Sequence, residues 1–137
     1  MAVVYFADTF FWVAVAHPRD AFHTHVRAWQ RSNPGASLVT TEEVLTEVLN
    51  WFAGLGPGAR LSAAQLVDDV QGDPTIQVLA QSALGFQSAL ALYRARPDKE
   101  YSLVDCRSML AMKSLGLTEV LTNDHHFSQE GFMVLFP

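Results

Sequence analysis

The segment TTEEVLTEVLN, residues 40–50, follows a short apolar run, SLV at 37–39, and begins a helical pattern. Its apolar residues recur at helical spacing on one arc, which comprises Val44, Leu45, Val48, Leu49 and Phe52. Glu47 falls about 40° beyond Trp51 at the border of this arc, at ~100° per residue. The segment therefore predicts a strand followed by a helix that carries an acid at the edge of its buried face.

Three other acids stand near the end of an apolar run. Asp8 follows VVYFA, Asp105 follows SLV, and Asp124 follows EVLT. The carboxyl ends of parallel strands meet at one edge of a sheet, where ligands bind in open α/β folds. Together with Glu47, these acids form a candidate divalent-metal site.

Apolar runs alternate with helical patterns along the whole chain. Strands are expected at 3–7, 37–39, 75–80, 119–122 and 133–136, and helices at 18–30, 40–52, 59–70, 81–95 and 105–115, with a short aromatic segment at 9–16. This alternation predicts an α/β fold with a parallel sheet of about five strands covered by helices on both faces. A length of 137 residues, half of them hydrophobic, fits a single domain spanning residues 1–137.

Composition narrows the function classes. Charged residues interrupt the apolar N-terminal region well short of a membrane span, and no signal peptide is recognisable. A single cysteine fits a reducing cytoplasm. The net charge of −5 argues against strong non-specific binding to nucleic acid. The basic group Arg94, Arg96 and Lys99 is interpreted as a solvated helix end, with a phosphate-tracking role as the alternative.

Each acid alone also has a structural interpretation, because Asp is a favoured helix N-cap. Asp105 is the exception, since Met109 and Met112 lie on its face of the predicted helix and turn it toward the core. Glu43 completes a predicted capping box with Thr40 and is interpreted as structural, whereas Glu47 is interpreted as functional.

Electrostatics favours a bound ion over an empty acidic cluster. Two carboxylates about 5 Å apart repel each other by roughly 3 kcal/mol at an effective dielectric constant near 20. Divalent cations would relieve this repulsion, and ligation by oxygen alone favours Mg²⁺ or Mn²⁺ over zinc.

The order of four motifs resembles that of the PIN-domain nucleases, and more narrowly the VapC-type toxins of toxin–antitoxin pairs. The motifs are Asp8-Thr9 after the first strand, T-x-x-V-L-x-E ending at Glu47, D-K-x-Y-S-L-V-D-C containing Asp105, and T-N-D-x-x-F containing Asp124. The resemblance implies a three-layer α/β/α sandwich and a Mg²⁺- or Mn²⁺-dependent endoribonuclease. It also implies a homodimer, a small antitoxin that blocks the site, an acidic site of Asp8, Glu47, Asp105 and Asp124, and polar residues Thr9 and Asn123 beside the metal.

Other interpretations remain open. His125 and His126 could extend the metal shell, but adjacent side chains diverge, so at most one can reach it; exposed loop histidines are the favoured interpretation. A PIN-like module that binds a partner without cleaving is one alternative. A phospho-acceptor receiver domain is a weaker one, because it needs paired acids after the first strand and a lysine after the last.

Overall fold

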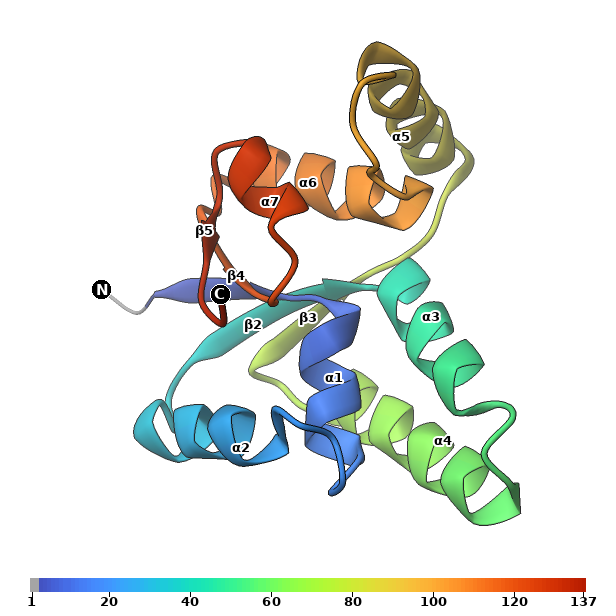
Figure 1. Ribbon diagram of the computed structural model, residues 1–137, viewed down its shortest axis with the longest axis vertical. Helices are drawn as coiled ribbons and strands as arrows, with labels where there is room; N and C mark the ends of the chain where they lie inside the picture. The colour runs from blue at the N-terminus through green and yellow to red at the C-terminus, as the bar shows by residue number, and fades with distance from the viewer. Residues whose placement is uncertain (1–2) are drawn as a thin grey trace.

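The computed structural model describes residues 3–137 and contains a parallel sheet (Figure 1). Within these residues the sheet has five strands in the order β3-β2-β1-β4-β5. Their bounds are Val4–Ala7 (β1), Ser37–Thr41 (β2), Ile76–Leu79 (β3), Glu119–Leu121 (β4) and Met133–Val134 (β5). The predicted parallel α/β fold is therefore confirmed, although β5 is shorter than the apolar run that predicted it.

Helices cover both faces of the sheet. Their bounds are Thr9–Ala16 (α1), His23–Ser32 (α2), Glu42–Phe52 (α3), Pro57–Gly72 (α4), Ala83–Ala95 (α5), Leu103–Leu115 (α6) and His126–Gln129 (α7). In Figure 1, α1, α2 and α4 lie on one side of the sheet and α6 and α7 on the other, while α5 packs on α6. The fold is the expected three-layer α/β/α sandwich.

The order in which successive strands are added to the sheet reverses at β1. From β1 the chain runs outward to β2 and then β3, and it returns to pair β4 with the free side of β1. The carboxyl ends of β1 and β4 therefore flank a topological switch point, which is where open α/β sheets bind ligands. The alternative of a receiver domain is wrong, because the strands of a receiver sheet have the order 2-1-3-4-5, whereas those of this sheet have the order 3-2-1-4-5.

The N-cap of helix α3 lies one residue later than predicted, and this changes the role expected for Glu43. Thr40 is a buried residue of β2, and its hydroxyl donates to the carbonyl oxygen of Ala7 over 2.9 Å. Thr41 caps the helix instead, accepting from the backbone N–H of Val44 at 3.1 Å. The predicted capping box between Thr40 and Glu43 is therefore wrong, because the strand continues through Thr41, two residues beyond its predicted end.

Other helix starts also shift, each because of a local hydrogen bond or a proline. Helix α2 begins at His23 and not near residue 18, since the Asp20 side chain accepts from the N–H of Phe22 and holds a turn. Helix α4 begins with Pro57 in its first turn. The short helix α7 was not predicted. None of the helices in residues 3–137 is long and apolar enough to cross a membrane.

Buried residues of α1 pack against the sheet and thereby fix the position of Asp8. Phe11, Trp12 and Ala14 of α1 are buried, and the indole N–H of Trp12 donates to the hydroxyl of Thr40. Because α1 follows β1 after the single residue Asp8, this packing leaves Asp8 at the end of the strand, facing the switch point.

Candidate active site at the carboxyl edge of the sheet

Asp8 is buried at the junction of β1 and α1, with 6 % of its surface exposed. It occupies the N-cap position of α1, yet its side chain makes no capping hydrogen bond. Instead, Oδ2 accepts from the hydroxyl of Thr122 over 2.9 Å, just beyond the end of β4. Capping therefore does not account for this carboxylate.

The electrostatic state of Asp8 is unusual for an aspartate. Burial raises its pKa to about 7, and the nearby charges of Asp105 and Glu47 raise it too, while hydrogen bonds from Thr9 and Thr122 lower it. Asp8, Asp105 and Glu47 thus lie close enough for their charges to repel one another, as the resemblance implies. A bound cation would favour the charged form.

Glu47 reaches the same place from α3. The hydroxyl of Thr9 donates to Glu47 Oε1 over 2.5 Å, so the residue after Asp8 holds this carboxylate. Burial raises the pKa of Glu47, the Thr9 hydrogen bond lowers it, and the charge of Asp105 raises it. The two other acids of α3 are occupied elsewhere: Glu43 pairs with Arg107 at 3.0 Å, and Glu42 accepts from the N–H of Gln81.

Asp105 lies in the first turn of α6, with 14 % of its side chain exposed. Its Oδ2 accepts from the N–H of Ser102, and the Ser102 hydroxyl accepts from the N–H of Asp105, which forms a capping box. Met109 and Met112 are buried, as predicted. Burial raises the pKa of Asp105 and the charge of Asp124 raises it further, although the Ser102 hydrogen bonds and His126 lower it. Asp105 therefore caps its helix and also contributes to the acidic cluster.

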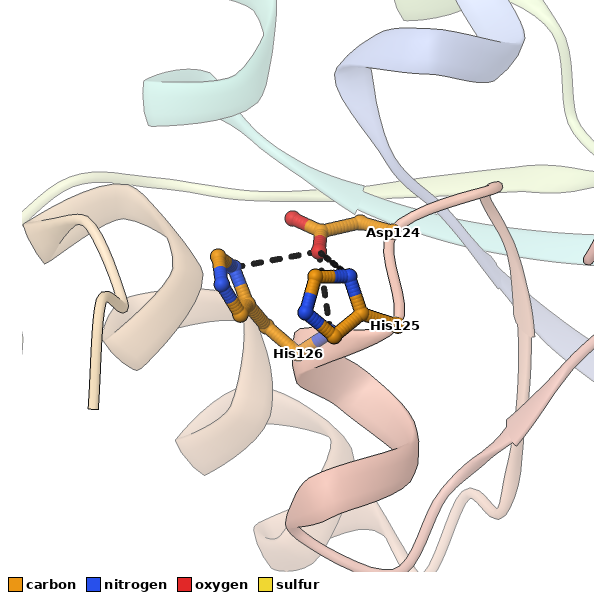
Figure 2. Close-up of side chains that lie close together, drawn as sticks. All are labelled: Asp124, His125 and His126. Carbon is orange, nitrogen blue, oxygen red and sulfur yellow. Dashed lines mark hydrogen bonds and ion pairs between the residues drawn. The ribbon is translucent and has the colours of Figure 1, made fainter.

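Asp124 lies in the turn before α7, and its Oδ1 accepts from the backbone N–H of His126 over 2.9 Å. Figure 2 shows the side chains of His125 and His126 on either side of this carboxylate. His125 is 75 % exposed, as expected for a loop histidine. His126 is only 17 % exposed, and its Nδ1 lies 3.1 Å from Asp124 Oδ1 and 3.8 Å from Asp105 Oδ2.

The favoured interpretation of His126 as an exposed residue is therefore wrong. The turn at Asp124 begins a helix, and the first residue of that helix points its ring toward α6. The sequence held one signal of this geometry, the apolar Phe127 that is buried next to it and fixes α7 on the sheet. Asn123, expected beside a metal, is exposed.

The hydroxyls of Thr9 and Thr122 connect the acids by hydrogen bonds. The sequence analysis expected Thr9 at the site but did not identify Thr122. Thr122 donates to Asp8 and accepts from the backbone N–H of Asp124 at 3.2 Å, so it links the two carboxylates that follow β1 and β4. Thr9 links Asp8 to Glu47 along the chain. All four predicted acids thus belong to one connected cluster, with His126 between Asp105 and Asp124.

The donor atoms of this cluster suit a divalent cation. Carboxylate oxygens are the ligands that Mg²⁺ and Mn²⁺ prefer. The ligand atoms of Asp124, His125 and His126 lie within 4.8 Å of one another. The raised pKa values of Asp8, Glu47 and Asp105 indicate carboxylates whose charge the protein alone does not compensate.

Two hollows flank the acidic cluster. One, the Trp51 cleft, has a volume of about 480 Å³ and is lined by Thr9, Glu47, Asn50 and Trp51. The other, the Tyr101 pocket, has a volume of about 210 Å³ and is lined by Tyr93, Arg96, Pro97, Lys99, Glu100 and Tyr101. The ring of Tyr101 contacts that of His126 edge-on, with centroids 5.6 Å apart. The Trp51 cleft thus includes one of the four acids, Glu47, and the Tyr101 pocket adjoins the cluster through the contact of Tyr101 with His126.

The sequence pattern of the PIN domain matches residues 5–132 of this chain. The 23S rRNA-specific endonuclease VapC20 of Mycobacterium tuberculosis, known in two strains, is 30 % identical over 136 residues, which cover 96 % of this chain and 98 % of that protein. Its crystal structure, described as that of a Sarcin-Ricin loop cleaving toxin, has a TM-score of 0.85 at 24 % identity and covers 98 % of this chain and 99 % of its own. FitAcB from Neisseria gonorrhoeae has the same fold, with a TM-score of 0.60, 20 % identity and 96 % of each chain covered. The chain belongs to the PIN domain family and is a VapC-type nuclease.

Proposed function

We propose that this protein is a Mg²⁺- or Mn²⁺-dependent endoribonuclease that hydrolyses RNA phosphodiester bonds, and that residues 1–137 form one PIN-like domain. One observation carries the proposal: Asp8, Glu47, Asp105 and Asp124 come from four separate segments and meet at the switch point of the sheet. Such a convergence of negative charge costs free energy in a metal-free protein, so it points to a counterion.

The four acids are assigned different roles. Asp8 and Asp105 hold the ion, because they are the most enclosed, and Glu47 and Asp124 complete the site directly or through water. Thr9 and Thr122 orient Glu47 and Asp8 by hydrogen bonds. Held by these residues, a divalent ion would supply activation of water and stabilisation of the charge that develops on a phosphate.

Single-stranded RNA is the substrate that the two hollows favour. The indole of Trp51 is 45 % exposed in the cleft beside Glu47 and offers a stacking surface for a base. Lys99 lines the Tyr101 pocket, and because its only ion pair among residues 3–137 is with the exposed Asp98 at 3.4 Å, a phosphate can compete for its ammonium group. Arg96 contributes less, because Glu130 holds its guanidinium at 2.6 Å. Ribosomal RNA is the first substrate to test, since VapC20 carries 23S rRNA specificity in its name.

Two exposed apolar sets support protein partners. Leu49 of α3, Leu55 of the turn after it and Leu61 of α4 are exposed, and Leu49 lies two residues before Trp51, so a small antitoxin seated over them and the Trp51 cleft would cover Glu47. Leu84 and Phe86 of α5 are 77 % and 52 % exposed and offer a surface for a second copy in a homodimer. We place such a toxin–antitoxin pair in the cytoplasm, where a lone buried thiol such as that of Cys106 stays reduced.

The experiment is cleavage of a panel of structured RNAs, including 23S rRNA, with Mn²⁺, with Mg²⁺ and with a chelator. The wild type should cleave at defined positions only with metal, and Asp105→Asn should lose at least about 100-fold in rate. Asp68→Asn, which changes an exposed carboxylate of α4, should match the wild type. Metal-dependent binding of RNA without any cleavage would instead support the alternative of a PIN-like module that binds but does not cut.

A further inference from the structure

His126 is the feature of the acidic cluster that the four-acid assignment does not use. Its Nδ1 lies between two of the acids, 3.1 Å from Asp124 Oδ1 and 3.8 Å from Asp105 Oδ2 (Figure 2). This nitrogen is buried and has no hydrogen-bond partner of acceptable geometry among residues 3–137. A buried, unpartnered nitrogen close to two carboxylates calls for a physical explanation.

Two contacts hold the ring in this direction. The backbone N–H of His126 donates to Asp124 Oδ1, which fixes the first residue of α7. One side of the ring packs edge-on against Tyr101, which is 5 % exposed and whose hydroxyl donates to Glu130 Oε1 over 3.1 Å. His125 packs against the ring of His126, with centroids 4.5 Å apart, but it is 75 % exposed and its Nδ1 lies further from Asp124 Oδ1, at 4.0 Å.

The spacing of the donor atoms matches ligands of one ion. Neighbouring ligands of an octahedral ion with bonds of about 2.1 Å are about 3.0 Å apart. The separation of 3.1 Å between His126 Nδ1 and Asp124 Oδ1 is close to this value, and that to Asp105 Oδ2, at 3.8 Å, needs only a small adjustment. The neutral imidazole would also add no further charge to the acidic site.

We propose that His126 Nδ1 is a metal ligand beside Asp105 and Asp124, and that it makes this site select Mn²⁺ over Mg²⁺. The selectivity follows from the donor set: carboxylate oxygens suit both ions, but Mn²⁺ is a first-row transition metal that also accepts an imidazole nitrogen, whereas Mg²⁺ is a hard ion that prefers oxygen ligands. The inference rests on the proposed function, because it assumes that the acidic cluster holds a divalent ion.

The rival explanation is that His126 only hydrogen-bonds to Asp124 from outside the coordination sphere. The two arrangements differ in whether nitrogen is bonded to the metal. Electron spin echo envelope modulation of Mn²⁺ detects the coupling of a directly bonded ¹⁴N, and it can be recorded on the full chain without RNA. Its readout is therefore independent of cleavage activity.

The Mn²⁺-loaded wild type should show ¹⁴N modulation that disappears in His126→Phe, a variant that keeps an aromatic ring against Tyr101. His125→Phe is the matched control and should retain the modulation. By titration calorimetry, Mn²⁺ should bind at least about tenfold more weakly to His126→Phe, while Mg²⁺ affinity changes little. His126→Gln, which restores an oxygen donor, should move the preference toward Mg²⁺.

Absence of ¹⁴N modulation in the wild type, or its persistence in His126→Phe, would overturn the inference. The same experiment separates this failure from failure of the proposed function. Mn²⁺ that binds without nitrogen ligation leaves the four-acid site intact and removes only His126 from it. A wild-type protein that binds no Mn²⁺ contradicts both.

Discussion

The hydroxyl of Thr122 donates to Asp8 Oδ2 over 2.9 Å and so joins the carboxyl ends of β4 and β1 at the switch point of the sheet. The hydroxyl oxygen of Thr122 also accepts from the backbone N–H of Asp124. Thr122 is fully buried, so both bonds are shielded from water. One residue without charge therefore sets the positions of two acids that are 116 residues apart in the sequence.

Replacing Thr122 by Val tests this positioning role, because it removes the hydroxyl and nearly preserves the side-chain volume. Asp8 would lose a hydrogen bond that stabilises its charged form, so Mn²⁺ affinity measured by calorimetry should fall about 10- to 100-fold. Thr118→Val, which changes an exposed threonine just before β4, is the matched control. Unaltered Mn²⁺ binding by Thr122→Val would show that Asp8 needs no such support.

The two glutamates of α3 should respond differently to the same substitution. Glu47→Gln should reduce the rate of RNA cleavage at least about tenfold, because Glu47 lies with Thr9 beside Asp8. Glu43→Gln should leave the rate unchanged and lower the free energy of unfolding, since the half-buried pair with Arg107 loses its charge complement. Initial rates and urea denaturation of both variants make the comparison. A larger rate loss in Glu43→Gln than in Glu47→Gln would reverse the assignment.

The metal-free protein should lose stability as the pH rises, because of Asp8. Its pKa of about 7 in the folded protein exceeds the ordinary value of 3.8, so the folded state binds this proton more tightly than the unfolded chain. The contribution to stability is complete below 3.8 and is lost as the pH passes through about 7. The loss amounts to at most roughly 4 kcal/mol.

Asp8→Asn removes this titration, so its stability should vary less between about pH 5 and about pH 8. At the upper end of that range the variant should be more stable than the wild type. Urea denaturation in the presence of a chelator measures both effects. If wild type and variant had the same pH dependence, Asp8 would not be the buried, uncompensated group described above.

Trp51 should matter for RNA affinity and not for metal binding. Stacking of a base on an aromatic ring contributes about 1–3 kcal/mol, so Trp51→Ala should weaken RNA binding roughly 5- to 150-fold. Binding can be measured with Asp105→Asn as the background to prevent cleavage. Leu61→Ala, at a 74 % exposed residue of α4, serves as the control. Equal affinities of the two variants for RNA would exclude the Trp51 cleft from the substrate path.

The layered fold could be predicted because its strands and helices have strong, separate patterns. Short apolar runs marked β1, β2 and β4, and the spacing of Met109 and Met112 from Asp105 indicated the buried face of α6. Asp8 and Asp124 were found because they follow the runs that form β1 and β4, Asp105 because its helix turns it toward the core, and Glu47 because it borders the buried face of α3.

What the sequence did not reveal depends on side-chain directions that arise only on folding. The cap of α3 moved from Thr40 to Thr41 because β2 pairs through Thr41 with Leu79 of β3. His126 was interpreted as exposed because a four-residue helix has too few residues to show a periodic pattern, and the ring direction follows from contacts with Tyr101. The role of Thr122 could not be predicted, because its partner Asp8 lies at the far end of the chain.

The most direct test of the acidic site is anomalous diffraction from crystals grown or soaked with Mn²⁺. An anomalous peak is expected at the carboxyl edge of the sheet, within coordination distance of both Asp8 and Asp105. An anomalous peak only elsewhere on the molecule would contradict the proposed metal site. Well-ordered Asp8 and Asp105 side chains with no anomalous peak beside them would contradict it as well.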